Sequence, residues 1–407
     1  MGLKYKICDI CEINRENLSK NDRWEYINYL DTSNLNKGII NEIHYLVVGK
    51  DKVPSRAKRK VKENDILIST VRPNQKHYGI LKKTVNNMIV STGFAVLTPN
   101  SEIVTPEYLY RFLTQDGITN YLQAVAETST SAYPSIKPSV IGELEIDLPP
   151  LEEQKAIVHI LSTLDEKIEV NNKINKTIEK MAQAIFKHWF IDFEFPNENG
   201  EPYKSSGGEM VESELGMIPK GWEVIDLGKI IKFKKGKKPK EIKETFFQNY
   251  KKYLTIDVLN RNSTLYANSE KMIIADEFDT LMVMDGASSG TVYYGQNGIV
   301  ASTLARVDIQ DKTLGKDFIY YVLKYFEDDI KANTTGSAIP HTDKEYVYSI
   351  KICIPNDFEI LERFNSIVRK LRETVINNEE ESAKLSSIRD TLLPKLMSGE
   401  IRVPLDN

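Results

Sequence analysis

The feature that most constrains the fold of this chain is an internal repeat with an offset of about 210 residues. Short motifs recur in the same order: Ser131-Ala-Tyr-Pro134 returns as Ser337-Ala-Ile-Pro340, and Asp65-Ile-Leu67 returns as Asp279-Thr-Leu281. Each copy ends in a long stretch of helical periodicity. The chain therefore contains two similar, diverged domains and two long helices, a layout suited to gripping a long ligand at two separate places.

Strand and helix signals predict an α+β chain. In the first copy, β-branched runs occupy residues 65–70 and 88–97, and residues 106–113 form a helix that begins with proline. The second copy repeats this order at 280–284, 299–307 and 318–325. The predicted segments are a domain at 1–150, a helix at 151–192, a linker at 193–215, a domain at 216–355 and a helix at 356–400. Its Glu, Gly, Ser, Asn and Pro content predicts that the linker is exposed and mobile.

Both long helices carry apolar residues three and four positions apart, which form one narrow seam that a partner helix must cover. The simplest partner is the other long helix. An antiparallel pair separates the two domains about a pseudo-twofold axis, whereas a parallel pair crowds them together. Helices of roughly 35 to 40 residues reach about 55 Å, which exceeds one turn of DNA. The predicted coiled-coil residues are Ile157, Leu161, Leu164, Ile168, Ile178, Met181, Ile185, Leu361, Phe364, Val368, Leu371, Val375, Leu385, Ile388 and Leu392.

Polar residues interrupt both seams near their middles. A polar residue at a seam position costs stability but fixes the register, because sliding would place an amide against apolar side chains. The interrupting residues are Asn171, Asn172 and Asn175 in the first helix and Asn377, Asn378 and Ser382 in the second.

The net charge of −4 argues at first against a nucleic-acid partner. The charge is unevenly distributed, because Lys and Arg outnumber Asp and Glu by 19 to 17 in residues 1–150 and by 20 to 18 in residues 216–355. The acidity therefore belongs to the helices and the linker. Three cysteines give no disulfide framework, and no apolar run approaches the roughly 18 residues of a membrane span, so we expect a cytoplasmic protein.

Two basic clusters at loop-like positions are candidates for phosphate contact, one in each copy of the repeat. A solvated charge run is the commoner meaning of such a stretch, but its presence in both halves favours the phosphate interpretation. The clusters are Lys50, Lys52, Arg56, Lys58, Arg59, Lys60 and Lys62, and Lys232, Lys234, Lys235, Lys237, Lys238, Lys240 and Lys243.

Base reading requires polar side chains on rigid supports. Loops after equivalent strands differ in sequence while their flanks resemble each other, as expected if the halves read different bases. Ordinary divergence of surface loops explains the same difference. The candidate readers are Arg72, Asn74, Gln75 and His77 in the first half and Ser288, Ser289 and Gln296 in the second.

Signatures of metal binding and catalysis are weak. Cys8 and Cys11 have the spacing of half a zinc site, but the matching place in the second copy has Gly228 opposite Cys11, which favours packing. The chain has no phosphate-binding glycine loop, no nucleophile elbow and no zinc-protease helix motif. We expect no bound metal and no catalytic residues.

Three motifs resemble those of the specificity (S) subunits of type I restriction-modification systems. Leu148–Gln154 reads LPPLEEQ and opens a long helix, Gly216–Val224 reads GMIPKGWEV and opens the second half, and Leu392–Ile401 reads LLPKLMSGEI near the end. The resemblance covers essentially the whole chain in order. One departure is that the second helix opens with PNDFEILE at 355–362 in place of the PLEEQ motif, which leaves open whether its docking face is equivalent.

The resemblance implies a fold, a function and partners. Two target recognition domains each read one half of a bipartite, asymmetric site in double-stranded DNA, and an antiparallel coiled coil spaces them. Two methyltransferase (M) subunits dock on the helices, and restriction (R) subunits join them. The chain itself is then not catalytic and binds no cofactor, with S-adenosylmethionine, ATP and Mg expected on the partner subunits.

Two other functions remain possible on the residues alone. A self-contained DNA methyltransferase or nuclease would transfer methyl groups or cut DNA without a partner. A coiled-coil scaffold would bind other proteins and no DNA, although the paired basic clusters count against that function.

Overall fold

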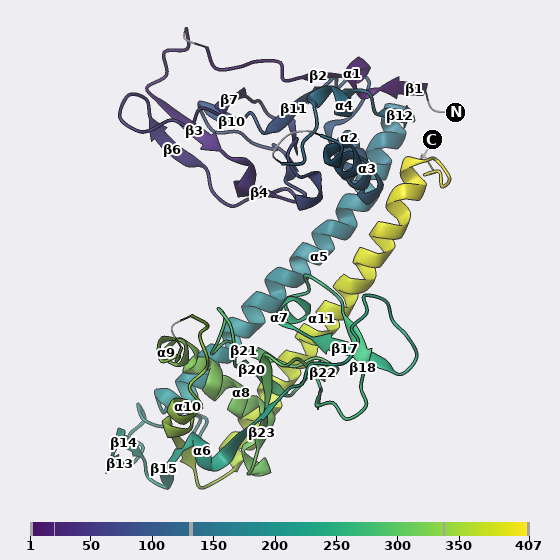
Figure 1. Ribbon diagram of the computed structural model, residues 1–407. Helices are drawn as coiled ribbons and strands as arrows, with labels where there is room; N and C mark the ends of the chain where they lie inside the picture. The colour runs from purple at the N-terminus through teal and green to yellow at the C-terminus, as the bar shows by residue number, and fades with distance from the viewer. Residues whose placement is uncertain (1–2, 20, 130–132, 337, 405–407) are drawn as a thin grey trace. The chain divides into compact units, whose positions relative to one another are not determined.

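The computed structural model describes residues 3–19, 21–129, 133–336 and 338–404 and divides into two compact units (Figure 1). Unit 1 consists of Met1–Glu169 and Ser382–Asn407, and unit 2 consists of Val170–Glu381. Each unit thus contains one repeat domain and a part of both long helices. Three residues of the repeated proline motif, Ser131, Ala132 and Ser337, lie outside the described residues.

The domain of unit 1 contains two four-stranded sheets and two small antiparallel pairs, β1–β12 and β4–β5. One sheet has the order β6-β3-β10-β7, in which β3 and β10 are parallel, and the other has the order β2-β11-β8-β9 and is antiparallel. The strands are β1 (Leu3–Lys6), β2 (Cys11–Ile13), β3 (Tyr26–Leu30), β4 (Leu35–Asn36), β5 (Ile39–Ile40), β6 (His44–Val47), β7 (Ala57–Lys60), β8 (Ile66–Ser69), β9 (Tyr78–Ile80), β10 (Met88–Ser91), β11 (Phe94–Pro99) and β12 (Glu145–Leu148). The short helices are α1 (Ile7–Ile10), η1 (Thr32–Asn34), η2 (Pro73–Gln75), α2 (Pro106–Leu113), α3 (Asp116–Glu127) and α4 (Pro138–Gly142).

The domain of unit 2 repeats the two four-stranded sheets and the pair β1–β12, whereas the small pair β4–β5 has no counterpart there. Its sheets have the orders β18-β17-β22-β19, with β17 and β22 parallel, and β16-β23-β20-β21, and β15 pairs with β24. The strands are β15 (Trp222–Asp226), β16 (Ile231–Lys235), β17 (Tyr250–Leu254), β18 (Tyr266–Asn268), β19 (Ile274–Ala275), β20 (Thr280–Val283), β21 (Val292–Tyr294), β22 (Gly298–Val300), β23 (Leu304–Ile309) and β24 (Lys351–Pro355). The short helices are α6 (Leu227–Ile230), α7 (Ile256–Leu259), η4 (Lys312–Leu314), α8 (Lys316–Tyr325), α9 (Glu327–Ala332) and α10 (Lys344–Ser349). The predicted internal repeat is confirmed.

The core of each domain explains the short apolar strands. Every residue of β8 and of β10 is buried, so both faces of these strands are covered, and the sequence shows a continuous apolar run rather than alternation. The predicted run at 88–97 is two strands rather than one, because the chain leaves one sheet at Ser91 and enters the other at Phe94. The run at 299–307 divides in the same way between β22 and β23.

The two long helices are α5 (Leu151–Phe186) and α11 (Glu359–Met397), and within each unit they lie side by side (Figure 1). In unit 1, Arg389 contacts Asp165 at 2.7 Å and Arg402 contacts Glu153 at 3.1 Å. Arg402 follows the end of α11. In unit 2, Asn171 contacts Glu381 and Asn175 contacts Asn378, so residue numbers rise on α5 as they fall on α11, and the helices are antiparallel, as predicted. Burying apolar seam residues contributes about 1.5 to 3 kcal/mol per side chain.

Two of the predicted seam residues do not lie on the seam. Met181 is 51% exposed and Ile388 is 48% exposed. With 3.6 residues per turn, residues three or four positions apart lie on the same face of a helix. Here the inward-facing positions are held by the neighbouring residues Ala182, which is fully buried, and Arg389, which contacts Asp165. Buried or half-buried positions hold the other predicted residues, which are Ile157, Leu161, Leu164, Ile168, Ile178, Ile185, Leu361, Phe364, Val368, Leu371, Val375, Leu385 and Leu392.

The polar residues in the seams of unit 2 contact one another. Asn378 donates a hydrogen bond from Nδ2 to Oδ1 of Asn175 at 2.8 Å, and Asn171 donates from Nδ2 to Oε2 of Glu381 at 2.8 Å. Asn172 and Asn377 are exposed and take no part in the seam. A shift of one helix along the other would place apolar side chains opposite these amides. The amides would then lose their hydrogen-bond partners, so the cluster favours one register.

The segment between α5 and β15 is mostly exposed but not without structure. A π-helical turn, η3 (Lys187–Ile191), continues α5, and β13 (Met210–Ser213) pairs with β14 (Gly216–Pro219). Phe195 is 4% exposed, and its ring stacks on Trp222 at 5.1 Å between ring centroids. The predicted linker is thus anchored to the core of unit 2 at this ring. Burial of an aromatic side chain against another ring is favourable, so this contact holds the segment in place.

Candidate nucleic-acid interface

The loop that joins β8 to β9 and the loop that joins β20 to β21 occupy the same place in the two domains. In unit 1, the backbone N–H of Arg72 donates to the carbonyl of Pro134 at 2.9 Å. In unit 2, the N–H of Gly286 donates to the carbonyl of Pro340 at 2.9 Å. The repeated proline motif thus closes both loops. The prediction that the loops follow equivalent strands is confirmed for the residues between β8 and β9 and for Ser288 and Ser289.

The unit 1 loop presents three of its four candidate base readers to solvent. Arg72, Asn74 and Gln75 are exposed. Arg72 has a left-handed φ of 49° and its guanidinium carbon lies 4.8 Å from the ring centroid of Tyr133, so the ring supports the cation. His77 is half-buried with Nδ1 2.7 Å from the carbonyl of Leu35. His77 therefore braces the loop from inside.

The unit 2 loop presents different chemistry at the equivalent place. Asp285 accepts a salt bridge from Lys235 at 2.7 Å and a hydrogen bond from Nδ1 of His341 at 2.8 Å. Partial burial alone would raise the pKa of Asp285, but the hydrogen bonds and charges of these two partners outweigh it and hold the pKa below its ordinary value. In unit 1, Val71 and Ser135 form the equivalent backbone bridge, so this ionic group belongs to unit 2 alone.

Two of the candidate readers in unit 2 are turned inward. Ser289 is 4% exposed, and its Oγ lies 2.8 Å from the carbonyl oxygens of both Gly286 and Pro340. Gln296 lies outside this loop, between β21 and β22, with Nε2 3.5 Å from the carbonyl of Leu259. Ser288 is half-buried. Asp285 and His341 cannot be recognised as a pair from the sequence, because residues 56 positions apart leave no local pattern.

The two basic clusters do not occupy equivalent places in the repeat. The first lies between β6 and β7 and on β7, a region whose counterpart between β18 and β19 contains only Lys271 as a cation. The second lies on β16 and in the loop before β17, whose counterpart begins at β2. Their recurrence in both halves therefore reflects separate loops of different length and gives no independent support for a shared role.

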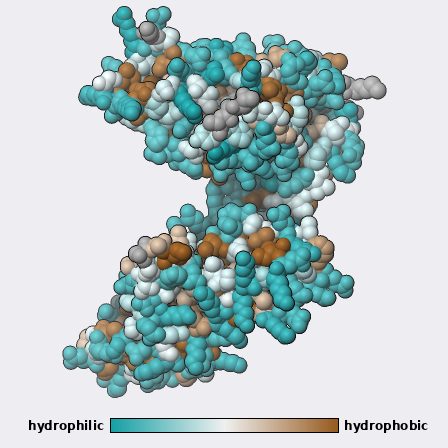
Figure 2. Space-filling model, in the orientation of Figure 1, coloured by the Kyte–Doolittle hydropathy of each residue, from teal (hydrophilic) through white to brown (hydrophobic). Residues whose placement is uncertain are grey.

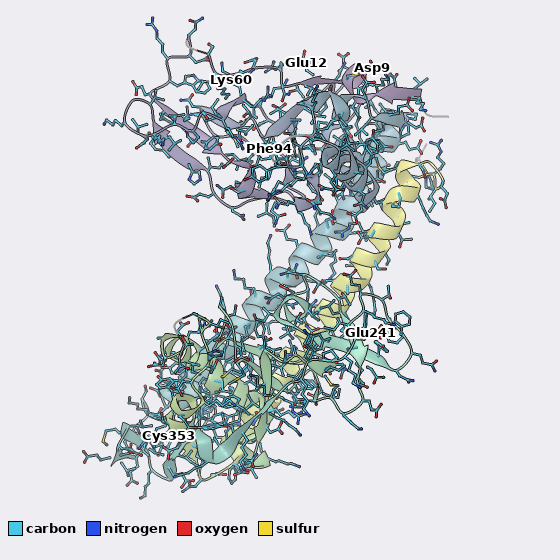
Figure 3. The ribbon with its side chains drawn as sticks, viewed as in Figure 1. Asp9, Glu12, Lys60, Phe94, Glu241 and Cys353 are labelled. Carbon is cyan, nitrogen blue, oxygen red and sulfur yellow. The ribbon has the colours of Figure 1, made fainter. Side chains whose placement is uncertain are left out.

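Part of the first cluster is occupied by internal contacts. Lys60 forms a salt bridge with Asp22 at 2.6 Å and lies 5.4 Å from the ring centroid of Trp24. Arg59 is half-buried and contacts Asn17 at 3.4 Å. The exposed cations of this cluster are Lys50, Lys52, Arg56, Lys58 and Lys62. Lys60 is marked in Figure 3 on the domain of unit 1.

The second cluster is more exposed. Lys232 and Lys234 alternate with half-buried Phe233 along β16, so both lysines are on the open face of that strand. Residues 232–252 contain nine lysines against two glutamates. Lys237, Lys238 and Lys240 are exposed, and within the part of the chain that the structure describes they form no salt bridge. This stretch is a strong candidate for contact with a polyanion.

The cysteines do not form a metal site in the described structure. Cys8 is exposed and Cys11 is buried, and burial raises the pKa of the Cys11 thiol to about 12. Helix α1 corresponds to α6, so Gly228 is opposite Cys8, and Ile231 rather than Gly228 is opposite Cys11. Among residues 3–19, 21–129, 133–336 and 338–404, no group of three or more His, Cys, Asp or Glu side chains could hold a metal ion.

The surface of each unit visible in Figure 2 is mainly hydrophilic, with hydrophobic patches between the hydrophilic areas. In the described part of the chain, no helix is both long enough and apolar enough to cross a bilayer.

Comparison with known proteins identifies the class to which this fold and these loops belong. Residues 3–180 and 219–386 match the model of the type I restriction modification DNA specificity domain. The HindI specificity subunit of Haemophilus influenzae is 27% identical, with 98% of this chain and 99% of that protein covered. The MjaIX specificity subunit of Methanocaldococcus jannaschii is 31% identical, with 78% and 74% covered.

Solved structures show the same fold. A type I restriction-modification S subunit from M. genitalium superimposes with a TM-score of 0.56 at 18% identity, covering 100% of this chain and 97% of that one. A chain solved in work on complex assembly and conformational transition of a type I system gives 0.51 at 20% identity, covering 98% of both. The fold is therefore that of two similar α+β domains with an antiparallel helical pair.

The chain belongs to the type I restriction-modification specificity subunit family. It is the DNA sequence-specificity subunit of such a system and works with methyltransferase and restriction subunits. Catalysis belongs to those partners. Neither a self-contained methyltransferase or nuclease nor a scaffold without DNA binding is favoured by these matches.

Proposed function

We propose that this specificity subunit reads a bipartite, asymmetric DNA site, with one half-site read by each repeat domain. The observation that carries the proposal is the pair of equivalent loops with different side chains: Arg72 and Gln75 are exposed in one, and the ionic group of Asp285, Lys235 and His341 stands in the other. Two domains with the same backbone framework and different loop side chains are suited to reading two different DNA sequences.

The proposed division of the chain follows the repeat. Target recognition domains occupy residues 1–150 and 216–355, the conserved helices occupy 151–192 and 356–400, and residues 193–215 connect the first helix to the second domain. The helices space the two readers and dock the partners.

Base edges and phosphates are contacted by different residues in this proposal. The guanidinium of Arg72 can donate two hydrogen bonds to guanine, and the amides of Asn74 and Gln75 can pair with adenine, because their donors and acceptors match those bases in the major groove. The exposed lysines of the second cluster contact phosphates and hold the duplex in register without reading its sequence.

The outer faces of the helices are the proposed docking surfaces for two M subunits. In unit 2, α5 exposes Val170 by 47%, Ile174 by 41% and Met181 by 51%. Exposed apolar side chains on a helix mark a surface that a partner covers. R subunits then join the M subunits, and S-adenosylmethionine, ATP and Mg are bound by the partners. A cytoplasmic location fits action on cellular DNA.

The proposal is tested by binding with and without the partner subunits. The isolated chain should bind duplex DNA weakly, because each domain carries a net charge of only +2, and addition of the M subunits should tighten binding strongly. Gel-shift titrations at one salt concentration measure the difference. Equal affinity with and without the M subunits would contradict the proposed division of labour.

A further inference from the structure

Two neighbouring phenylalanines in unit 2 are exposed although each contacts a tyrosine: ring centroids are 5.7 Å apart for Phe246 and Tyr266 and 5.8 Å apart for Phe247 and Tyr250. Phe246 is 67% exposed and Phe247 is 44% exposed. In the part of the chain that the structure describes, Phe358 is the one other phenylalanine exposed to a comparable degree, at 38%. Phe246 and Phe247 lie between β16 and β17, in a segment from Gly236 to Tyr250 that we name the basic arm. An apolar ring left in water is a cost that a bound partner can remove.

The basic arm is anchored at several points, so the rings are presented in a defined place. Lys243 and Tyr266 exchange two backbone hydrogen bonds, at 2.9 and 2.7 Å. The N–H of Tyr250 donates to the carbonyl of Phe247 at 3.0 Å, which closes a tight turn directly after the two rings. Gly236 starts the arm so close to the carbonyl of Ala301 that a Cβ would stand 2.1 Å from its oxygen. Figure 3 marks Glu241 of the arm beside the β17 region.

One cation lies beside the exposed rings, and more cations than carboxylates lie along the arm. The ammonium of Lys243 lies 4.2 Å from the ring centroid of Phe247 and 5.6 Å from that of Tyr250. Lys237, Lys238 and Lys240 extend the positive charge along the arm. A partner that satisfies both features must offer dense negative charge beside flat apolar faces. Nucleic acid combines phosphates with bases in this way, whereas a protein partner has to supply carboxylates and an apolar pocket separately.

The equivalent loop of unit 1 lacks this feature. It runs from residue 14 to residue 25 between β2 and β3, and its aromatic residue, Trp24, is half-buried against the ammonium of Lys60. Residue 20 lies outside the described residues. The exposed pair of rings therefore belongs to one of the two domains.

We propose that Phe246 and Phe247 form an apolar wedge that enters a base step of the DNA bound by unit 2 and unstacks it. The inference rests on the proposed function and adds a deformation of the duplex in one half-site only. Phenylalanine side chains that enter the stack open the step and bend the duplex. Lys243 forms a salt bridge with Glu241 at 3.3 Å, so the exposed Lys237, Lys238 and Lys240 contact the phosphates. Specificity then comes partly from how easily a given step unstacks.

The test uses the complex of the full chain with its M subunits and a duplex that contains the mapped site. Single 2-aminopurine substitutions are placed at positions across both half-sites except at the methylated adenines, where the partner acts on the base. Unstacking raises the fluorescence of this base analogue. We expect a rise at one step in one half-site with the unaltered chain and no rise with Phe246→Ala/Phe247→Ala.

Three further measurements distinguish a wedge from a structural role. The double alanine variant should bind about 10-fold or more weakly with an unchanged salt slope, since base stacking and phosphate contact are separate contributions. Phe246→Leu/Phe247→Leu should recover part of the affinity and the fluorescence, because leucine also serves as a wedge. Phe358→Ala, which removes an exposed ring outside the arm, should behave like the unaltered chain. If the double variant does not fold, Phe246→Ala alone removes the more exposed ring.

The alternatives are resolved by the same set. A chain with M subunits that binds no specific duplex overturns the proposed function itself. Specific binding without a fluorescence rise in either half-site, or with the same rise in the alanine variants, overturns the wedge and leaves the proposed function standing. Loss of an M subunit from the alanine variant, measured by gel filtration without DNA, shows that the rings dock protein and also overturns the wedge.

Discussion

The two repeat domains share a buried frame and differ where they meet solvent. Asp65 in unit 1 and Asp279 in unit 2 precede equivalent central strands, and both are buried, at 2% and 9% exposure. At the loop ends of the same strands, Val71 stands where unit 2 has Asp285. Packing holds the frame constant, because a change in a filled core costs stability, whereas a loop residue changes at little cost. Any difference in DNA reading between the two domains must therefore come from the loops.

The largest effect is expected when the distance between the two domains is changed. Insertion of one heptad into each long helix, near Asn172 and near Asn378, keeps both seams in phase and adds about 10 Å, or roughly three base pairs. We expect the variant to keep both half-sites and to require a longer spacer, or to lose specific binding. Binding to duplexes with a series of spacer lengths measures this. Full affinity for the original spacer would show that the helices do not set the distance.

The next effect concerns the charge that is present in one domain and largely absent at the same place in the other. Lys234, Lys237, Lys238 and Lys240 changed together to glutamine should weaken binding to every sequence, and each lost phosphate contact should lower the salt slope by about 0.9. Lys235 is kept, because its salt bridge to Asp285 supports the loop. Gel shifts over a range of salt concentrations give the slope. An unchanged slope would assign these lysines to a solvated face.

A smaller effect should be confined to one half-site. Arg72→Ala and Gln75→Ala remove exposed donors from the unit 1 loop, and each lost bidentate contact should reduce discrimination by about 1 to 3 kcal/mol at its base pair. Competition binding with duplexes altered in one half-site at a time measures the change. Relaxed preference in both half-sites would contradict separate readers.

The smallest expected effect is on the pH dependence of stability, and it arises because the two buried aspartates have different partners. Asp65 accepts hydrogen bonds from Thr98 at 2.6 Å and from the N–H of Lys62 at 2.8 Å, whereas Asp279 forms a salt bridge with Lys316 at 2.7 Å. Burial raises the pKa of Asp65 despite those hydrogen bonds. A raised folded-state pKa gives stability that is present at low pH and lost as the pH rises through that pKa.

The corresponding prediction is that Asp65→Asn flattens the pH dependence of unfolding above pH 4. The unaltered chain should lose a small amount of stability as Asp65 ionises, and the variant should not. Thermal unfolding between pH 4 and pH 8 measures the difference. A parallel decline in both chains would show that another group causes it.

Much of the fold follows from the sequence because its signals are local or repeated. The recurrence of Asp65-Ile-Leu67 as Asp279-Thr-Leu281 and the spacing of seam residues predicted the repeat and the helical pair. The prediction that Met181 and Ile388 lie on the seam was wrong. Spacings of three and of four residues both fit a helix, and only packing decides which of the two positions faces inward.

The candidate site was less predictable than the fold. Sequence indicated the loop of Arg72 and Gln75, but not that His77 and Ser289 face inward, since loop conformation depends on contacts distant in sequence. The meeting of Lys235, Asp285 and His341 depends on three separate segments. The exposure of Phe246 and Phe247 is likewise invisible in the sequence, where phenylalanine usually indicates a buried position.

The most direct test of two independent readers is a map of methylated bases in genomic DNA from cells that contain this chain and its M subunits. The account predicts two short, different half-sites separated by a spacer of fixed length and free sequence. With Arg72→Ala/Gln75→Ala, one half-site should relax while the other half-site and the spacer stay unchanged. A single uninterrupted motif, or a variant that changes both halves together, would contradict the account.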